Sequence, residues 1–262
     1  MKKFHAVGNY LERLPLAFVD CRMIVSLDLS FNHFKDIPAP VFNLVKLEEL
    51  NFAHNDIQEV SSSLGQLVNL RILNLAGNTL SELPLDVAKC RRLHRLDLSG
   101  KFYPRGQIRE FPDGICYLFE LTDLDLSWQQ IEKIPDEFGN LKRLENLNLK
   151  GNHLQHVSAQ ISKCSRLQNI NLAGALRLRS EIPDALFSLE DLQVLNLSDN
   201  FFTEIPDKVC DVRRLTTLTM QRNALLRLPD NLFQVCMHFV LCRSFLDISH
   251  NLSIIYEFLF HF

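Results

Sequence analysis

The hydrophobic residues of this chain recur at a regular interval. The segment from Leu70 to Leu80 shows the unit, with apolar side chains at its first, fourth, sixth and eleventh positions and an asparagine at its ninth. Copies of the unit begin at Ile24, Leu47, Leu70, Leu93, Leu121, Leu144, Leu167, Leu192 and Leu215. Successive starts lie 23 residues apart, except for gaps of 28 after Leu93 and 25 after Leu167. This register over nine copies predicts a repeat architecture.

The start of each copy predicts a short strand. In the third copy apolar and polar residues alternate, so Leu73 and Leu75 are expected to face inward and Asn74 to face solvent. Stacked copies would form a parallel sheet with a spacing of about 4.8 Å. Apolar residues then follow at intervals of four, three and three, as at Ile134, Phe138, Leu141 and Leu144. They predict an opposite wall of short helical or irregular segments, and each repeat is stabilised by its neighbours.

A proline follows the second apolar set in most copies: Ile37-Pro38, Leu83-Pro84, Phe111-Pro112, Ile134-Pro135, Ile182-Pro183, Ile205-Pro206 and Leu228-Pro229. The whole pattern resembles the leucine-rich-repeat family, written LxxLxLxxNxL followed by (I/L)PxxIxxLxxL. The period and the proline are most similar to its intracellular 23-residue type, the Ras-suppressor-like, Shoc2-like and Scribble-like proteins. The resemblance implies an α/β solenoid, a leucine-rich-repeat horseshoe with a concave parallel β-sheet and short helical or irregular convex segments.

The resemblance extends over residues 1–237, with a partial first repeat at 1–23 and nine registered repeats from residue 24. Residues 238–262 are expected to form a divergent apolar C-terminal cap or a non-repeat tail. Solenoids usually carry polar caps at their ends, and neither end of this chain has that composition. Two interpretations stay open: an apolar cap, or a fragment or isoform of a longer protein.

The ninth position of the repeat carries asparagine in six copies: Asn32, Asn55, Asn78, Asn152, Asn200 and Asn223. The family resemblance implies that these side-chain amides are buried and satisfy backbone groups where the chain leaves the strand. Lys101, Gln129 and Ala175 replace asparagine in the fourth, fifth and seventh copies. The fourth and seventh copies are also the long ones, so local irregularity is expected there.

Candidate binding residues lie at the positions expected to face solvent: the second, third, fifth, seventh and eighth. Phe31 and Trp128 occupy the eighth position, which is His54 in the second copy and glycine in several others. An outward aromatic ring beside an open face suits an interaction hot spot. For Trp128 the alternative is a ring lying over its own loop, because Gln129 alters the turn. The fifth position, which includes Asp97 and Asp125, forms a polar row that either binds a polar partner surface or reflects ordinary family usage.

The long fourth repeat adds a basic and aromatic loop. It contains Lys101, Phe102, Tyr103, Arg105 and Arg109, together with Gly and Pro. Insertions in repeat proteins emerge on one face and often carry binding. This loop is therefore a candidate contact for an acidic partner, and a neutral surface insertion is the alternative.

Composition narrows the classes of function. The formal net charge is −3, from 28 basic and 31 acidic residues, which argues against nucleic acid as a partner. Charges interrupt the apolar segment after residue 239, so membrane insertion is not expected. The seven cysteines show neither CxxC pairs nor zinc spacing, and no metal or cofactor is expected. No secretory signal is recognisable, and the expected location is the cytoplasm.

These observations favour a non-catalytic protein–protein interaction scaffold that binds a globular partner on its concave face. No phosphate loop, nucleophile elbow or kinase signature is present in the sequence, so it is not expected to be an enzyme. The family resemblance implies an intracellular signalling adaptor, with a small GTPase or a phosphatase subunit as partner. The alternative is the repeat region of a larger multidomain enzyme, such as a kinase, a Roco-type GTPase or a ubiquitin ligase.

Overall fold

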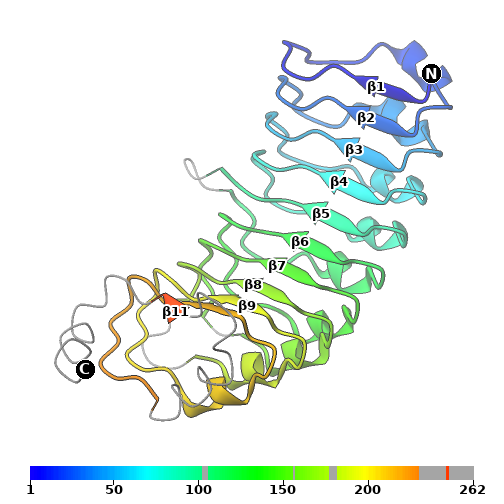
Figure 1. Cartoon of the computed structure of the whole chain (residues 1–262). Helices are drawn as coiled ribbons and strands as arrows, with labels where there is room; N and C mark the ends of the chain where they lie inside the picture. Colours follow the sequence, from blue (N-terminus) through cyan, green and yellow to red (C-terminus); the bar gives the residue numbers. More distant parts are fainter. Residues whose placement is uncertain (102–105, 156, 177–181, 230–245, 248–262) are drawn as a thin grey trace.

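The computed structural model describes residues 1–101, 106–155, 157–176, 182–229 and 246–247. In these ranges the chain winds into an open solenoid whose eleven strands form one parallel sheet. The strands stack in sequence order along the inner side of a gentle curve (Figure 1). Their bounds are β1 Lys3–His5, β2 Ser26–Asp28, β3 Glu49–Asn51, β4 Ile72–Asn74, β5 Arg95–Asp97, β6 Asp123–Asp125, β7 Asn146–Asn148, β8 Asn169–Asn171, β9 Val194–Asn196, β10 Thr217–Thr219 and β11 Leu246–Asp247.

Short 3-10 helices form the outer wall of the described part (Figure 1). They are η1 Leu16–Asp20, η2 Ala39–Asn43, η3 Ser62–Gln66, η4 Leu85–Lys89, η5 Asp113–Tyr117, η6 Asp136–Asn140, η7 Ala159–Lys163, η8 Asp184–Ser188 and η9 Asp207–Asp211. Most begin directly after a proline, as η6 does after Pro135, whose ring fixes a backbone angle suited to a helix start. Each is five residues long, and after η2 to η9 the next residue is buried; Leu141, which follows η6, donates its N–H to the carbonyl of Phe138.

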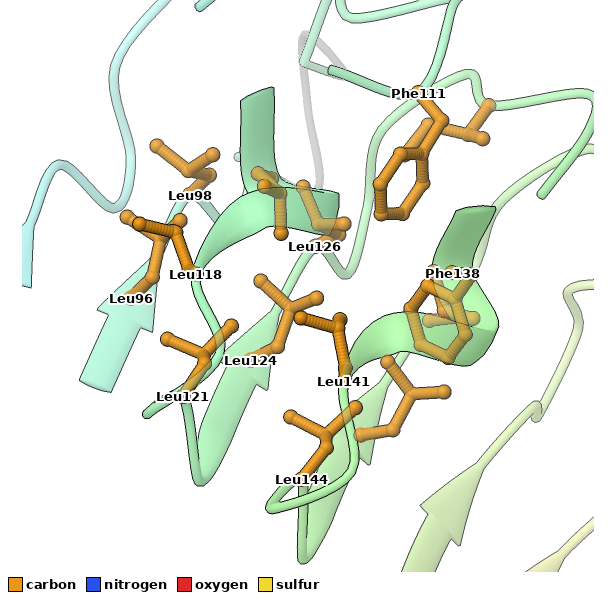
Figure 2. Close-up of a cluster of buried hydrophobic side chains, with 14 of the residues drawn as sticks. Leu96, Leu98, Phe111, Leu118, Leu121, Leu124, Leu126, Phe138, Leu141 and Leu144 are labelled. Carbon is orange, nitrogen blue, oxygen red and sulfur yellow. The ribbon is translucent and has the colours of Figure 1, made fainter. Parts of the chain in front are cut away.

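The core is a continuous apolar layer between these two walls. Figure 2 shows Leu124 of β6 and Leu126 just after it facing Phe138, Leu141 and Leu144 from the opposite wall, all at most 2% exposed. Aromatic rings join adjacent repeats at the outer wall, where Phe111 meets Phe138 edge-on with ring centroids 5.7 Å apart. Truncating one such leucine to alanine typically costs about 2–5 kcal/mol. The expected leucine-rich-repeat solenoid is confirmed.

The sheet keeps its register across the long fourth repeat. Leu96 pairs with Leu124 across this repeat, just as Leu73 pairs with Leu96 across a repeat of ordinary length. The length of the fourth repeat therefore leaves the register of β5 and β6 unchanged. An equally long step in sequence recurs at the carboxyl end, where Leu218 of β10 pairs with Leu246 of β11. The sheet thus continues beyond residue 237, and the rest of the expected tail lies outside the described residues.

Candidate functional site

The asparagines of the ninth position join neighbouring repeats. Asn78 donates from Nδ2 to the carbonyls of Leu75, at 2.8 Å, and Phe52, at 2.9 Å, and its Oδ1 accepts the N–H of Ile57 at 3.0 Å. The same three bonds recur, with equivalent partners, at Asn32, Asn55, Asn152, Asn200 and Asn223. Each amide satisfies buried backbone groups of two repeats at once, which is a structural role.

In two of the substituted copies, other atoms bond some of the backbone groups that asparagine bonds elsewhere. Gln129 donates from Nε2 to the carbonyl of Leu98 at 2.6 Å and accepts the N–H of Ile108 at 3.1 Å. Its side chain is longer by one methylene and lies against Gly106, where a β-carbon would overlap it. In the seventh copy the carbonyl of Ala175 itself accepts the N–H of Leu154 at 2.8 Å. The irregularity expected in the long repeats falls on residues 102–105 and 177–181, outside the described residues.

The eighth position has left-handed backbone geometry in most repeats. Its φ angle is between 51° and 60° at Phe31, His54, Trp128, Asp199 and Arg222, and between 59° and 72° at Gly77, Gly151 and Gly174. Glycine adopts this conformation freely, whereas for other residues it costs roughly 1–2 kcal/mol. The non-glycine side chains in this row are therefore not explained by the backbone of the turn.

Four aromatic rings gather along this edge of the first three repeats, and we call Tyr10, Phe31, His33 and His54 the aromatic edge. Phe31 stacks on His54 with ring centroids 4.4 Å apart and planes 19° apart. Tyr10 stacks on His33 at 5.7 Å. Phe31 is 55% exposed and Tyr10 is 88% exposed. Sequence analysis missed Tyr10 and His33, although their equivalent positions in successive repeats were a usable signal.

Trp128 occupies the same row but is partly covered. Its ring lies against Gly151 of the next repeat, so that a β-carbon at Gly151 would clash with Cε3. The ammonium of Lys150 lies 5.2 Å from the ring centroid. The indole thus packs on the following turn, whereas Phe31 presents an open ring. Gln129 keeps two of the three bonds that asparagine makes elsewhere, and Trp128 has the left-handed backbone common to this row.

The fifth-position row does not simply face solvent. Asp97 and Asp125, paired neighbours on β5 and β6, are half-buried. Asp97 accepts the N–H of Ser99 at 2.9 Å and Asp125 that of Ser127 at 2.8 Å, so both side chains brace their turns. The seventh position, also expected to face solvent, is buried in most repeats, as at Ala76.

Asp97 and Asp125 line an open groove of about 610 Å³ along the concave face. Burial raises the pKa of Asp97, and the Asp125 carboxylate adds to that shift against hydrogen bonds from Ser99. The groove also contains Arg95 and Asp123 at the third position. These two residues were not among the sequence candidates.

The basic and aromatic loop is described only at its ends. Lys101 is half-exposed and Arg109 is exposed, whereas Phe102, Tyr103 and Arg105 lie outside the described residues. Arg109 lines an open cleft of about 1030 Å³ together with Glu82, Glu110 and Asp113. Three carboxylates therefore share this cleft with Arg109.

The buried cysteines are core residues. Burial raises the pKa of Cys90 to about 11 and that of Cys116 and Cys164 to about 12, so these thiols stay protonated at neutral pH. Among the described residues, no cluster of three or more His, Cys, Asp and Glu side chains is arranged to hold a metal. Nor does any helix in the described ranges have the length and apolarity needed to cross a bilayer.

Comparison with known proteins identifies the family. One leucine-rich-repeat family profile matches residues 22–80 and 119–176, and a second matches residues 191–211. Together these segments span just over half of the chain, which therefore belongs to the leucine-rich-repeat family. Proteins of this family commonly mediate protein–protein interactions. No curated protein matches the sequence significantly.

Solved structures share the fold. The functional domain of InlJ from Listeria monocytogenes matches with a TM-score of 0.77 and 22% identity over 97% of this chain and 49% of that one. A leucine-rich-repeat protein of Leptospira interrogans matches with a TM-score of 0.69 and 23% identity over 95% and 72% of the two chains. The ectodomain of the Arabidopsis thaliana receptor kinase GASSHO1/SCHENGEN3, in complex with CASPARIAN STRIP INTEGRITY FACTOR 2, matches with a TM-score of 0.66 and 29% identity. That match covers 81% of this chain and 26% of the ectodomain.

Proposed function

We propose that this chain is a non-catalytic scaffold that binds a protein partner along its concave face, with the aromatic edge as the anchor. The observation that carries the proposal is the stacked pair of Phe31 and His54. Both residues hold a left-handed backbone that glycine would adopt at lower cost, and the phenylalanine ring is still 55% exposed. Strained residues with open aromatic rings are typical of binding sites, where a few such side chains carry most of the affinity.

The surroundings of the aromatic edge specify the chemistry of the partner segment. Glu49 on β3 is exposed, and Asp28 on the adjacent strand β2, where it pairs with Asn51, is half-buried. Asp56 lies near the aromatic edge, with its Oδ2 3.8 Å from Nδ1 of His33. Aromatic faces and carboxylates together favour a cationic side chain, since a cation over an aromatic ring gains about 0.5–2 kcal/mol. We therefore propose that the docked segment is basic and partly apolar.

The setting we propose is the cytoplasm, with the chain acting as an adaptor in signal transduction. Similarity of the repeat to the Ras-suppressor-like and Shoc2-like type supports a small GTPase or a phosphatase subunit as the partner. The cysteines support a reducing compartment, because Cys21, Cys90, Cys116 and Cys164 are free thiols. Within the fold family, the plant ectodomain structure provides an example of a leucine-rich repeat in complex with a partner.

Glycine substitution tests the proposal without weakening the turn. The double variant Phe31→Gly/His54→Gly removes both rings and relieves two strained backbones, so its thermal stability should equal or exceed that of the wild type. Captured proteins are quantified from cell extract, and the affinity of each is then measured with purified components. We expect the double variant to lose at least about tenfold in affinity for the partner.

The matched control is Asp199→Gly/Arg222→Gly, which makes the same exchange in the same row at the other end of the solenoid. This control should retain the partner. Equal affinity of the partner for the wild type and for Phe31→Gly/His54→Gly would refute the aromatic edge as anchor.

A further inference from the structure

The opposite edge of the solenoid carries a concentration of positive charge. Four successive turns connect a 3-10 helix to the next strand, at residues 89–92, 117–120, 140–143 and 163–166. Together they hold seven cations and one carboxylate, Glu120, although the whole chain has a net charge of −3. The cations are Lys89, Arg91, Arg92, Lys142, Arg143, Lys163 and Arg166, and all seven are exposed. We call these four turns the basic edge.

The packing of each turn explains why its charged side chains are exposed. The second residue of every turn is fully buried, and Figure 2 shows Leu118 and Leu141 in this role within the core. Cys90 and Cys164 are its equivalents in the flanking turns. The other three side chains of each turn are exposed, except that of Glu120, which is partly covered. Because strands stack at about 4.8 Å, the four turns form one row roughly 14 Å long.

Exposed apolar side chains lie among these cations. Tyr117 is 46% exposed and Phe119 is 54% exposed, and both belong to the turn between those of Arg91 and Lys142. The same row continues toward the amino terminus with Val68, 51% exposed, and Val45, 49% exposed. Phe119, Val68 and Val45 occupy equivalent positions of their repeats. Aromatic and aliphatic groups therefore project from the same edge as the cations.

Ion pairing within the protein neutralises only part of this charge. Lys89 pairs with Asp86, and Arg143 pairs with Glu120. Lys142 donates to the carbonyl of Lys163 at 2.9 Å, which leaves its charge uncompensated. Most of the positive charge of the basic edge therefore remains available to an external anion.

We propose that the basic edge docks on the surface of an anionic phospholipid bilayer. A bilayer interface can bind both the cations and the apolar side chains of this edge. Lipid phosphates and carboxylates attract lysine and arginine, while exposed apolar side chains enter the headgroup region. A nucleic acid or an acidic peptide would use the charge and could stack on the rings, but would gain little from Val45 and Val68. Docking by this edge leaves the concave face open, so lipid and protein partner can be bound together.

The test is co-sedimentation of the full chain with vesicles of phosphatidylcholine alone, or with about one lipid in three replaced by phosphatidylserine. We expect sedimentation with the phosphatidylserine vesicles only, and its loss at high salt. The variant Arg91→Gln/Lys142→Gln should partition about thirtyfold less, at about 1 kcal/mol for each cation. Phe119→Ser should partition about tenfold less, because it removes the ring that enters the headgroups.

The matched control is Lys35→Gln/Lys133→Gln, which removes two exposed lysines outside the basic edge and should sediment like the wild type. Circular dichroism melting verifies that every variant is folded. Sedimentation with neither vesicle, equal sedimentation with both, or an equal loss in the control variant overturns the proposal. So does tighter binding to polyuridylate RNA than to the vesicles, which would assign the edge to nucleic acid.

Discussion

The eighth and ninth positions of the repeat are adjacent in the chain, yet they form two contrasting rows along the solenoid. The ninth-position row is largely buried and carries asparagine in six copies, with Asn78 as its representative, and Gln129 keeps two of the three asparagine bonds. The eighth-position row has a common backbone conformation but variable side chains, from Gly77 to Phe31 and Arg222. The fold thus constrains the side chain at the ninth position, whereas at the eighth position it constrains the backbone.

The eighth position keeps one backbone conformation while its side chain varies. This backbone is left-handed both before asparagine, as at Gly77, and before alanine, as at Gly174. The side chains of Phe31, Trp128 and Asp199 lie toward the equivalent residue of the next repeat. Phe31 stacks on His54, Trp128 covers Gly151, and Asp199 pairs with Arg222. Side chains in this row therefore interact in pairs along the solenoid.

The largest expected effect on stability comes from removing one side-chain amide of the ninth-position row. Asn78→Leu keeps the approximate volume but leaves the N–H of Ile57 and the carbonyl of Leu75 without their partner, whereas the carbonyl of Phe52 keeps its bond from Asn55. Each buried unsatisfied group costs about 1–3 kcal/mol, so we expect a loss of roughly 2–6 kcal/mol of unfolding free energy in urea titrations. Asn43→Leu, at an exposed position, is the control and should change stability by less than about 0.5 kcal/mol. A similar small change at Asn78 would contradict the structural role of the row.

An intermediate effect is expected within the eighth-position row. Gly174→Ala should cost about 1–2 kcal/mol for its left-handed backbone alone, because the nearest atom to the new β-carbon is 3.7 Å away. Gly151→Ala carries the same strain and also displaces the ring of Trp128, so its cost should be greater by about 1 kcal/mol or more. Trp128 is the single tryptophan of the chain, and its fluorescence should shift to longer wavelength in Gly151→Ala only. Equal stability and equal emission in the two variants would show that the indole does not depend on Gly151.

The smallest effect is expected where the eighth-position pair is an exposed ion pair. The hydrogen bond and charge of Arg222 lower the pKa of Asp199. A carboxyl whose folded pKa is depressed contributes stability above its unfolded pKa, and this contribution is lost as the pH falls through the folded value. In Arg222→Gln, which keeps a non-glycine residue at this left-handed position, the pKa of Asp199, followed by NMR titration, should return toward its ordinary value. The change in melting temperature should be the smallest of this series and should vanish at high salt.

Much of the fold could be predicted because one period governs the whole chain. The alternation at Leu73, Asn74 and Leu75 predicts the strand, and the register of nine copies predicts the parallel sheet. The bonding of the asparagines followed from the family resemblance. The equivalence of Gln129 could not be predicted, since it depends on the path that the chain takes past Gly106.

The candidate site was predictable only in part. Phe31 and His54 were found as departures from glycine, but the stacking of Tyr10 on His33 depends on loop geometry. Trp128 appeared equivalent to Phe31 because the sequence does not show how far a ring leans onto the next repeat. The basic edge was missed because its cations are spread over four repeats, and each turn alone looks like an ordinary charged surface.

The exchange of asparagine for Gln129 has a consequence for how such a chain can change over time. One additional methylene lets the side chain span an enlarged turn while the register of β5 and β6 is unchanged. The loop of the fourth repeat is therefore longer while the paired strands keep their register, and two ninth positions, Lys101 and Gln129, depart from asparagine there. The fourth repeat is accordingly a natural insertion point, where new peptide segments could be grafted for engineering with glutamine retained at position 129.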